Sequence, residues 1–158
     1  MRLIISLFLL FQLIQLIQSM QVKQALNVFS RPLQLCCNNP KTGFFRDGFC
    51  NTNALDAGRH LVCVKVTNDF LKFSKQRGND LITPIPEYNF PGLKHGDCWC
   101  LCVLRWKEAF EAGKAPYINL EATHIKTLEY VKLEDLMKYD ISKLPQFQQS
   151  INIMNDSL

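Results

Sequence analysis

The sequence predicts an α+β fold, as a single compact domain with a small mixed or antiparallel sheet, short helices and long loops. Residues 20–158, which follow an apolar leader, are enough to bury one hydrophobic core. Strand-like and helix-like patterns occur without the strict alternation that marks a doubly wound parallel sheet, and no internal repeat is present. We place the domain at residues 20–144 and expect the Gln- and Asn-rich residues 145–158 to form a frayed tail.

The first nineteen residues have the pattern of a secretory signal peptide. Arg2 precedes an apolar run from Leu3 to Ile17, and Ser19 supplies a small residue before a cleavage point. A helix of that length reaches about 22 Å, short of the roughly 30 Å of a bilayer core. An uncleaved membrane anchor and a mitochondrial targeting segment are the alternatives. We expect cleavage after residues 1–19, no stable membrane span afterwards, and a secreted protein or one in the lumen of the secretory pathway.

The first expected element is a strand over residues 25–29. A dense loop at residues 44–53 follows, and then the clearest strand, residues 60–66, which is rich in β-branched side chains. Thr67 is a suitable N-cap for a helix, and Gly78 is a suitable residue to end it. This part of the chain therefore predicts a strand that leads directly into a helix.

The second half begins with a long loop over residues 79–97, where several prolines and glycines exclude most regular structure. Loops of this length are often functional, although a flap covering the core has the same pattern. The next elements are a strand over residues 98–103 and a helix over residues 105–112. Residues 117–122 alternate as a last strand, and residues 133–138 predict a short closing helix.

Seven cysteines are many for a cytosolic protein of this size and ordinary for an oxidising compartment. Because the number is odd, at least one thiol is free, metal-bound or bridged to another chain. Cys98, Cys100 and Cys102 alternate along the expected strand and would share one face. Neighbours two apart on a strand face have Cβ atoms about 6.5–7 Å apart, beyond the roughly 3.8 Å of a disulfide. Their expected partners lie elsewhere in the chain: Cys36 or Cys37, Cys50 and Cys63.

The charge pattern argues against one class of partner. The formal net charge is +4, and lysines and arginines are interspersed with aspartates and glutamates. No basic block or basic stripe with interleaved aromatic residues is present. We therefore expect no nucleic-acid partner.

Five segments carry a resemblance to a known family. They include Thr-Gly-Phe-Phe-Arg-Asp-Gly-Phe-Cys at residues 42–50 and Trp-Cys-Leu-Cys at residues 99–102. The others are Arg-Gly-Asn-Asp-Leu at 77–81, Phe-Pro-Gly-Leu-Lys at 90–94 and Leu-Glu-Ala-Thr-His at 120–124. The chain resembles the small, mostly bacterial family called domain of unknown function 2237, over about residues 26–139. The resemblance implies one compact domain and brings no known activity.

This sequence departs from the family pattern in two respects. Typical members lack a secretory leader, and they have residues other than cysteine at the positions of Cys37 and Cys98. A secreted member that gains two cysteines suggests a new crosslink. The resemblance therefore implies a Cys37–Cys98 disulfide, which would close a loop of about sixty residues.

The function that the sequence favours is a module that binds an unidentified small molecule or protein. The guanidinium of Arg46 offers a planar fork for an anionic ligand, although Arg-Asp-Gly at residues 46–48 is also an ordinary turn. The candidate binding residues are Arg46, Asp47, Arg77, Arg105, Glu121 and His124.

An enzyme that uses a cysteine thiol is the alternative function. A nucleophilic cysteine needs a neighbouring base or cation, and His60 and His124 are the candidates for that role. The absence of Cys-x-x-Cys removes the usual signature of a thiol oxidoreductase. The candidate catalytic residues are Arg46, His124, Cys100 and Cys102, with Cys63 as a further possible nucleophile.

A structural zinc site is a weaker alternative. Cysteine and histidine are the ligands that zinc prefers, but Cys100-Leu101-Cys102 lacks the two or more intervening residues of ordinary zinc knuckles. We predict no cofactor. The ligands of this alternative would come from Cys50, His60, Cys63, Cys100 and Cys102.

Overall fold

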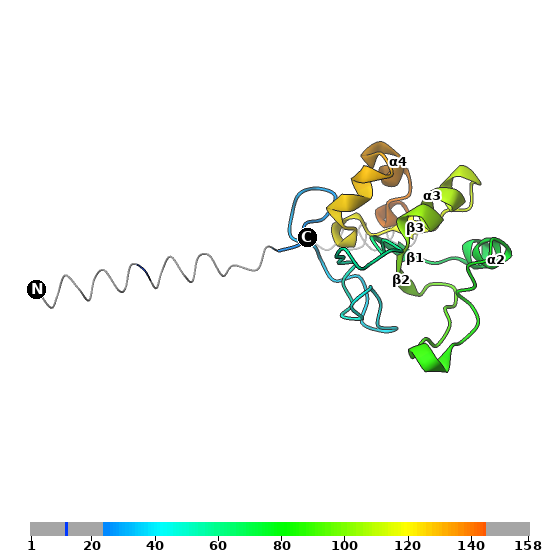
Figure 1. Ribbon diagram of the computed structural model, residues 1–158. Coiled ribbons are helices and arrows are strands. Elements are labelled where there is room, and N and C mark those ends of the chain that lie inside the picture. Colours follow the sequence, from blue (N-terminus) through cyan, green and yellow to red (C-terminus); the bar gives the residue numbers. More distant parts are fainter. Residues whose placement is uncertain (1–11, 13–23, 145–158) are drawn as a thin grey trace, which may run out of the picture.

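The computed structural model describes Gln12 and residues 24–144. In these residues the fold is α+β, as predicted, with a three-stranded antiparallel sheet in the order β2-β1-β3 and three α-helices (Figure 1). The elements are β1 (Val62–Lys65), α2 (Asn68–Gln76), β2 (Cys98–Leu101), α3 (Val103–Glu111), β3 (Tyr117–Ile118) and α4 (Leu133–Lys138).

One face of the sheet supports the main hydrophobic core. Val64 of β1 and Leu101 of β2 are buried there together with one large side chain from each helix. Those side chains are Phe70 of α2, Trp106 of α3 and Leu136 of α4. Fully burying a side chain of this size stabilises the fold by roughly 1.5–3 kcal/mol. The three helices therefore share one core with the sheet (Figure 1).

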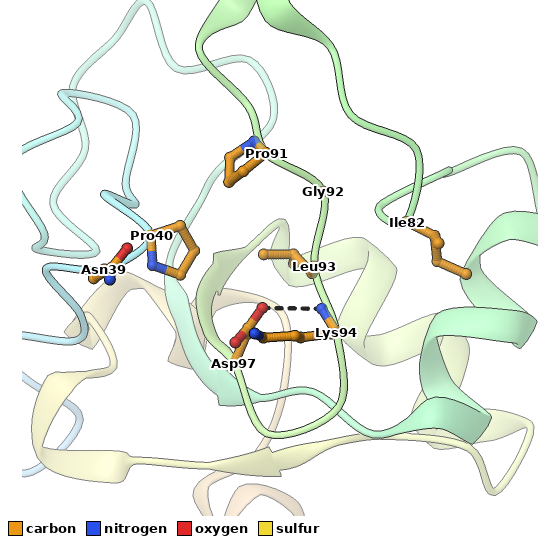
Figure 2. A pocket seen from close by; sticks show the side chains of 8 residues that line it. All are labelled: Asn39, Pro40, Ile82, Pro91, Gly92, Leu93, Lys94 and Asp97. Atoms are coloured by element: carbon orange, nitrogen blue, oxygen red, sulfur yellow. Dashed lines mark hydrogen bonds between the residues drawn. The ribbon is translucent and has the colours of Figure 1, made fainter.

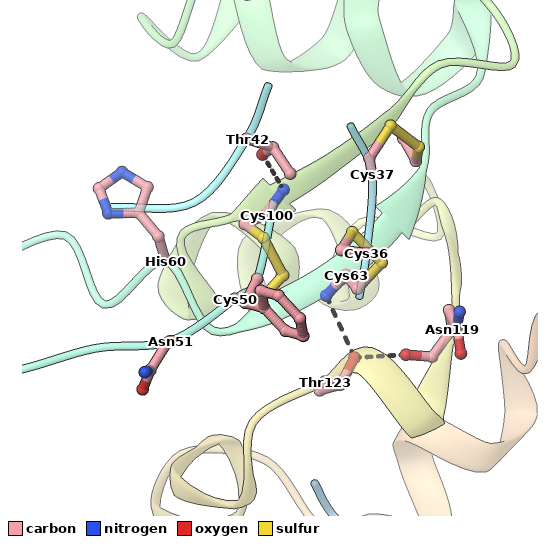
Figure 3. Close-up of a disulfide and its surroundings, with 12 residues drawn as sticks. Cys36, Cys37, Thr42, Cys50, Asn51, His60, Cys63, Cys100, Asn119 and Thr123 are labelled. Carbon is pink, nitrogen blue, oxygen red and sulfur yellow. Dashed lines mark hydrogen bonds between the residues drawn. A yellow bond between two sulfur atoms is a disulfide. The ribbon is translucent and has the colours of Figure 1, made fainter. Parts of the chain in front are cut away.

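The opposite face of the sheet carries cysteines. Cys63 of β1 lies directly opposite Cys100 of β2. The Cys63 N–H donates to Thr123 Oγ1 at 3.1 Å and the Cys100 N–H donates to Thr42 Oγ1 at 2.7 Å (Figure 3). Since neither N–H bonds the facing strand, this is a non-hydrogen-bonded pair, the kind in which side chains approach most closely.

Helix α2 follows its predicted boundaries. Thr67 is the N-cap, and its hydroxyl accepts a hydrogen bond from the Phe70 N–H at 3.1 Å. Gly78 follows the C-cap with a φ of 79°, a left-handed conformation that glycine adopts without strain. The predicted helix over residues 133–138 is likewise present as α4.

The predicted strand over residues 98–103 and the helix at 105–112 need correction. The strand ends at Leu101, Cys102 is the N-cap of α3, and the helix begins at Val103. The Val103 N–H donates to the Arg59 carbonyl at 3.0 Å, and Trp106 N–H donates to the Cys102 carbonyl at 3.1 Å. These bonds start the helical turn two residues early, so Cys102 leaves the strand.

Three other predicted strands are shorter or absent. In residues 25–29 only Leu26 and Asn27 form isolated bridges, and a turn follows in which the Asn27 side-chain oxygen accepts from the N–H groups of Phe29 and Arg31 at 2.9 and 3.1 Å. The strand predicted at 60–66 is four residues long, and the one at 117–122 shortens to β3 before a 3₁₀ turn. Polar side chains that bond the local backbone compete with strand pairing at these places.

Two predicted segments lie outside the described residues, namely the tail at residues 145–158 and, apart from Gln12, the leader at residues 1–19. Among the residues that are described, no helix is long and apolar enough to cross a membrane.

Candidate functional site

A short loop before β1 builds the candidate site. The Asn53 side-chain oxygen accepts from the Leu55 N–H at 2.8 Å, and the Arg59 N–H donates to the Asp56 carbonyl at 3.1 Å. Arg59 has a φ of 51°, a conformation that non-glycine residues rarely adopt. These tight turns fold the loop back on itself and point the Asp56 side chain inward.

Asp56 is a buried carboxylate at the centre of this loop, with no exposed side-chain surface. Its Oδ2 accepts from the His60 N–H at 2.9 Å and from the Thr52 hydroxyl at 3.0 Å. Burial acts to raise the pKa of Asp56, but the hydrogen bonds from His60 and Thr52 outweigh it and lower the pKa. Asp56 is therefore a charged acceptor held in one position.

His60 lies between this carboxylate and a thiol. Its Nδ1 is 2.6 Å from Asp56 Oδ1, and about one third of its side-chain surface is exposed. A hydrogen bond with Cys102 raises the pKa of His60 to about 9; burial opposes this shift, and the Asp56 carboxylate adds to it. At neutral pH the imidazole of His60 is consequently protonated.

Cys102 completes the arrangement and is the free cysteine of the chain. All seven cysteines lie among the described residues, and the other six form disulfides. Cys102 is partly exposed and occupies the N-cap position of α3. The bond from Val103 N–H to the Arg59 carbonyl ties this helix end to the loop, which places the thiol beside His60.

Two neighbours shape the space around the thiol and the imidazole. The Phe44 ring stacks on the His60 ring with 6.4 Å between centroids. A Cβ added at Gly58 would lie 2.7 Å from His60 Cε1 and 3.2 Å from Cys102 Sγ. The missing side chain at Gly58 therefore lets the loop pass directly over the pair.

The other cysteines crosslink the sheet to the loop that precedes it. The structure pairs Cys37 with Cys98, the two residues that the family resemblance paired. The remaining disulfides are Cys36–Cys63 and Cys50–Cys100 (Figure 3). Two expectations were wrong: Cys63 pairs with Cys36 and not with a cysteine of residues 98–102, and Cys102 has no disulfide partner.

Disulfide bonding also changes the candidates for nucleophile and metal ligand. Cys63 and Cys100 carry no free thiol, so neither is available as a nucleophile in this structure. The zinc set drawn from the sequence loses Cys50 as well, which leaves His60 and Cys102. A disulfide sulfur cannot act as the thiolate ligand that zinc requires.

Arg77 and Arg105 lie close together in the structure because both form ion pairs with the carboxylate of Glu108. Arg77 Nε lies 2.9 Å from Glu108 Oε1, and Arg105 Nη1 lies 3.1 Å from Glu108 Oε2. The hydrogen bond from Arg105, with help from Arg77, lowers the pKa of Glu108. This cluster links α2 to α3.

The remaining predicted binding residues lie in separate local contacts. The Arg46 guanidinium stands over the Trp99 ring, 5.1 Å from its centroid. Asp47 accepts from the Phe49 N–H at 3.0 Å within a turn, and Glu121 pairs with Arg31. These contacts do not join Arg46, Asp47 and Glu121 into one cluster.

His124 has a capping role in the structure. It is 6% exposed, and its Nδ1 accepts from the Lys126 N–H at 3.1 Å at the start of a 3₁₀ helix. Burial lowers the pKa of His124, and the charge of Lys126 lowers it further. His60, and not His124, is the histidine that meets the free thiol.

A hollow of about 430 Å³ lies elsewhere, beside the long loop (Figure 2). Residues 91–94, Ile82 and Asp97 line it together with Asn39 and Pro40 from the N-terminal loops. The Lys94 N–H donates to Asp97 Oδ2 at 2.9 Å within it. The thiol, the imidazole and the buried carboxylate do not line this hollow.

Comparison with known proteins gives the family but no activity. A family model described as an uncharacterized protein conserved in bacteria (DUF2237) matches residues 26–140. The chain belongs to this family. The DUF2237 match confirms the resemblance drawn from the sequence and covers both the Asp56 loop and Cys102. No curated protein matches the chain.

Sequence reasoning missed Asp56 within this DUF2237 domain. The available signal was Asp-x-x-x-His at residues 56–60 inside a loop rich in turn-forming residues, followed by a strand. That spacing becomes informative only when the partner of His60 is known, because acidic residues are common in loops. The structure supplies that partner, Cys102, from a segment some forty residues later.

Proposed function

We propose that this protein is a thiol-dependent enzyme that transfers acyl groups, with Cys102 as the nucleophile. The observation that carries the proposal is the row of three side chains: a free thiol, an imidazole that lies beside it over Gly58, and a buried carboxylate 2.6 Å from that imidazole. Nucleophile, base and orienting group in this order are the general signature of covalent catalysis by cysteine.

Each residue has a distinct role in this proposal. Cys102 attacks as the thiolate, a form that a neighbouring imidazolium stabilises. His60 carries the proton, since its pKa is raised to about 9. Asp56 holds the His60 ring through Nδ1 and stabilises its positive charge, and Thr52 and the loop backbone hold Asp56.

The reaction is written as transfer of an acyl group to water. The Cys102 sulfur forms a bond to the carbonyl carbon, and the bond to the leaving group breaks as His60 donates its proton to that group. His60 then removes a proton from water, and the hydroxide attacks the thioester carbonyl carbon. The carbon–sulfur bond breaks, which releases the carboxylic acid and restores the Cys102 thiolate beside a protonated His60. Cys102 is a partly exposed residue, as a nucleophile that must reach a substrate requires.

Trapping of the acyl-enzyme tests this proposal. The purified chain is mixed with p-nitrophenyl acetate, and release of nitrophenol and the intact mass are followed together. We expect one acetyl group per chain on Cys102 and a burst of nitrophenol, both absent in Cys102→Ser and slowed in His60→Gln. Lys107, a partly exposed residue of α3 with no role in the site, supplies the matched control Lys107→Gln. Acetylation elsewhere, or at the same rate in His60→Gln, would contradict the proposal.

Secretion is part of the proposal. Three disulfides and a leader-like N-terminal segment support it. The intact mass of the protein released by a eukaryotic host tests it: cleavage near residue 19 supports secretion, and a retained leader in the cell fraction contradicts it.

A binding module, the function that the sequence favoured, is a second candidate. The hollow beside the long loop supports it as a place for a ligand (Figure 2).

A further inference from the structure

Two disulfides lie next to each other on the cysteine face of the sheet. They are Cys36–Cys63 and Cys50–Cys100 (Figure 3). The Sγ atoms of Cys36, Cys50 and Cys100 all lie within 4.8 Å of one another. The fourth sulfur, that of Cys63, is bonded to Cys36 and comes from the residue directly opposite Cys100. Three sulfurs from three separate segments therefore converge at one place, and the fourth is bonded to one of them.

The spacing of these sulfurs is close to that of a metal site. Four thiolates around zinc lie about 2.3 Å from the metal and so roughly 3.8 Å from one another in a tetrahedron. Opening the two S–S bonds would free the four cysteine side chains to rotate toward that spacing. Cys50, Cys63 and Cys100 are at most 2% exposed, as in closed structural zinc sites.

The backbone around the sulfurs is held independently of the disulfides. Hydroxyls of Thr123 and Thr42 accept from the N–H groups of Cys63 and Cys100, and the β1–β2 register fixes these two residues opposite each other. Another hollow, of about 180 Å³, is lined by Cys36, Cys63 and Gly96 among others. It gives a reductant and a metal ion a path to the cluster.

We propose that Cys36, Cys50, Cys63 and Cys100, when reduced, form a tetrathiolate site for one zinc ion. Two molecules of a dithiol reductant open the two disulfides, giving four protein thiols and two cyclic disulfides. Zinc then displaces four protons and binds four thiolates. The crosslinked form and the zinc form exclude each other, because the same sulfurs serve both. This site is separate from Cys102 and does not depend on the proposed enzyme activity.

Cobalt, which takes the place of zinc and absorbs light, tests the site. The full chain is reduced anaerobically with a dithiol, the reductant is removed, and Co²⁺ is added while absorption, circular dichroism and native mass are recorded. We expect one cobalt per folded chain, with sulfur-to-cobalt charge transfer and the intense visible bands of a tetrahedral tetrathiolate site. The oxidised protein is expected to bind none.

Matched variants assign the ligands. Cys50→Ser with Cys100→Ser should abolish the tetrathiolate spectrum, whereas Cys37→Ser with Cys98→Ser, and Cys102→Ser alone, should keep it. If the reduced chain unfolds but regains its dichroism with cobalt, metal-coupled folding supports the site. A reduced chain that is folded without binding cobalt, one that stays unfolded with cobalt, or a spectrum lost in Cys102→Ser would overturn it.

Discussion

His60 is partly buried and His124 is almost fully buried, yet the groups around the two rings differ. His60 contacts a buried carboxylate and a free thiol, and its pKa is raised to about 9, above the ordinary value. His124 accepts a backbone hydrogen bond at a helix start, and burial lowers its pKa. The difference shows that two specific partners, and not burial, identify the histidine suited to chemistry.

Exchanging each histidine for glutamine gives the largest expected contrast. In His60→Gln the imidazolium beside Cys102 is lost, and we expect turnover of an activated ester to fall about 10²-fold or more. In His124→Gln turnover should change little, because that ring contacts neither Cys102 nor Asp56. Steady-state rates with matched far-ultraviolet spectra check both variants. Equal losses in the two variants would show that His60 has no role in turnover that His124 lacks.

Removing the charge of Asp56 tests whether the carboxylate sustains the state of His60. In Asp56→Asn the shape is kept, but the pKa of His60 should fall from about 9 toward its ordinary value, with a smaller loss of turnover than in His60→Gln. Proton NMR of the His60 Cε1–H signal measures this titration in the parent protein and in Asp56→Asn. The His124 signal serves as an internal control, and an unchanged His60 titration would refute the role given to Asp56.

Adding one methyl group at Gly58 tests the close packing over the pair. A Cβ there would meet His60 Cε1 at 2.7 Å, so Gly58→Ala should push the ring away and destabilise the fold by about 1–3 kcal/mol. Alkylation of Cys102 should slow as well. Ala57→Ser, at the exposed neighbouring residue, is the control for urea unfolding and for the alkylation rate. If Gly58→Ala behaves like this control, the loop does not constrain the pair.

The pH dependence of stability should have opposite signs at the two histidines. The raised pKa of His60 contributes stability that is fully present below its unfolded value of 6.5 and is lost as the pH rises through about 9. The lowered pKa of His124 does the reverse, contributing stability that is present above 6.5 and lost as the pH falls. Urea unfolding of His60→Gln and His124→Gln across this range should differ from the parent at opposite ends.

The sequence predicted the fold class, helices α2 and α4, and the family. Thr67 and Gly78 mark the ends of α2 by local capping chemistry that needs no tertiary contact. The ends of the strands were harder to predict from the sequence. The hydrogen bond from Val103 to Arg59 that begins α3, for example, joins residues far apart in the chain. Local patterns cannot report such a contact.

The candidate site was predicted only in parts. His60 and Cys102 both appeared among the candidate residues, but several cysteines were equally suitable until the disulfides were known. Pairing of the other six leaves Cys102, and the bond from the Val103 N–H to the Arg59 carbonyl brings it beside the Asp56 loop. Asp56 was missed because its role depends on folding of that loop around His60.

The rate at which iodoacetamide alkylates Cys102, followed by intact mass across the pH range in the parent protein and in His60→Gln, is the most direct test. The account predicts that the parent reacts faster near neutral pH, by about tenfold or more, because a protonated His60 stabilises the thiolate. The two rates should converge above about pH 9, where His60 loses its proton. Equal rates at every pH would contradict the account, since Cys102 and His60 would then not act as a pair.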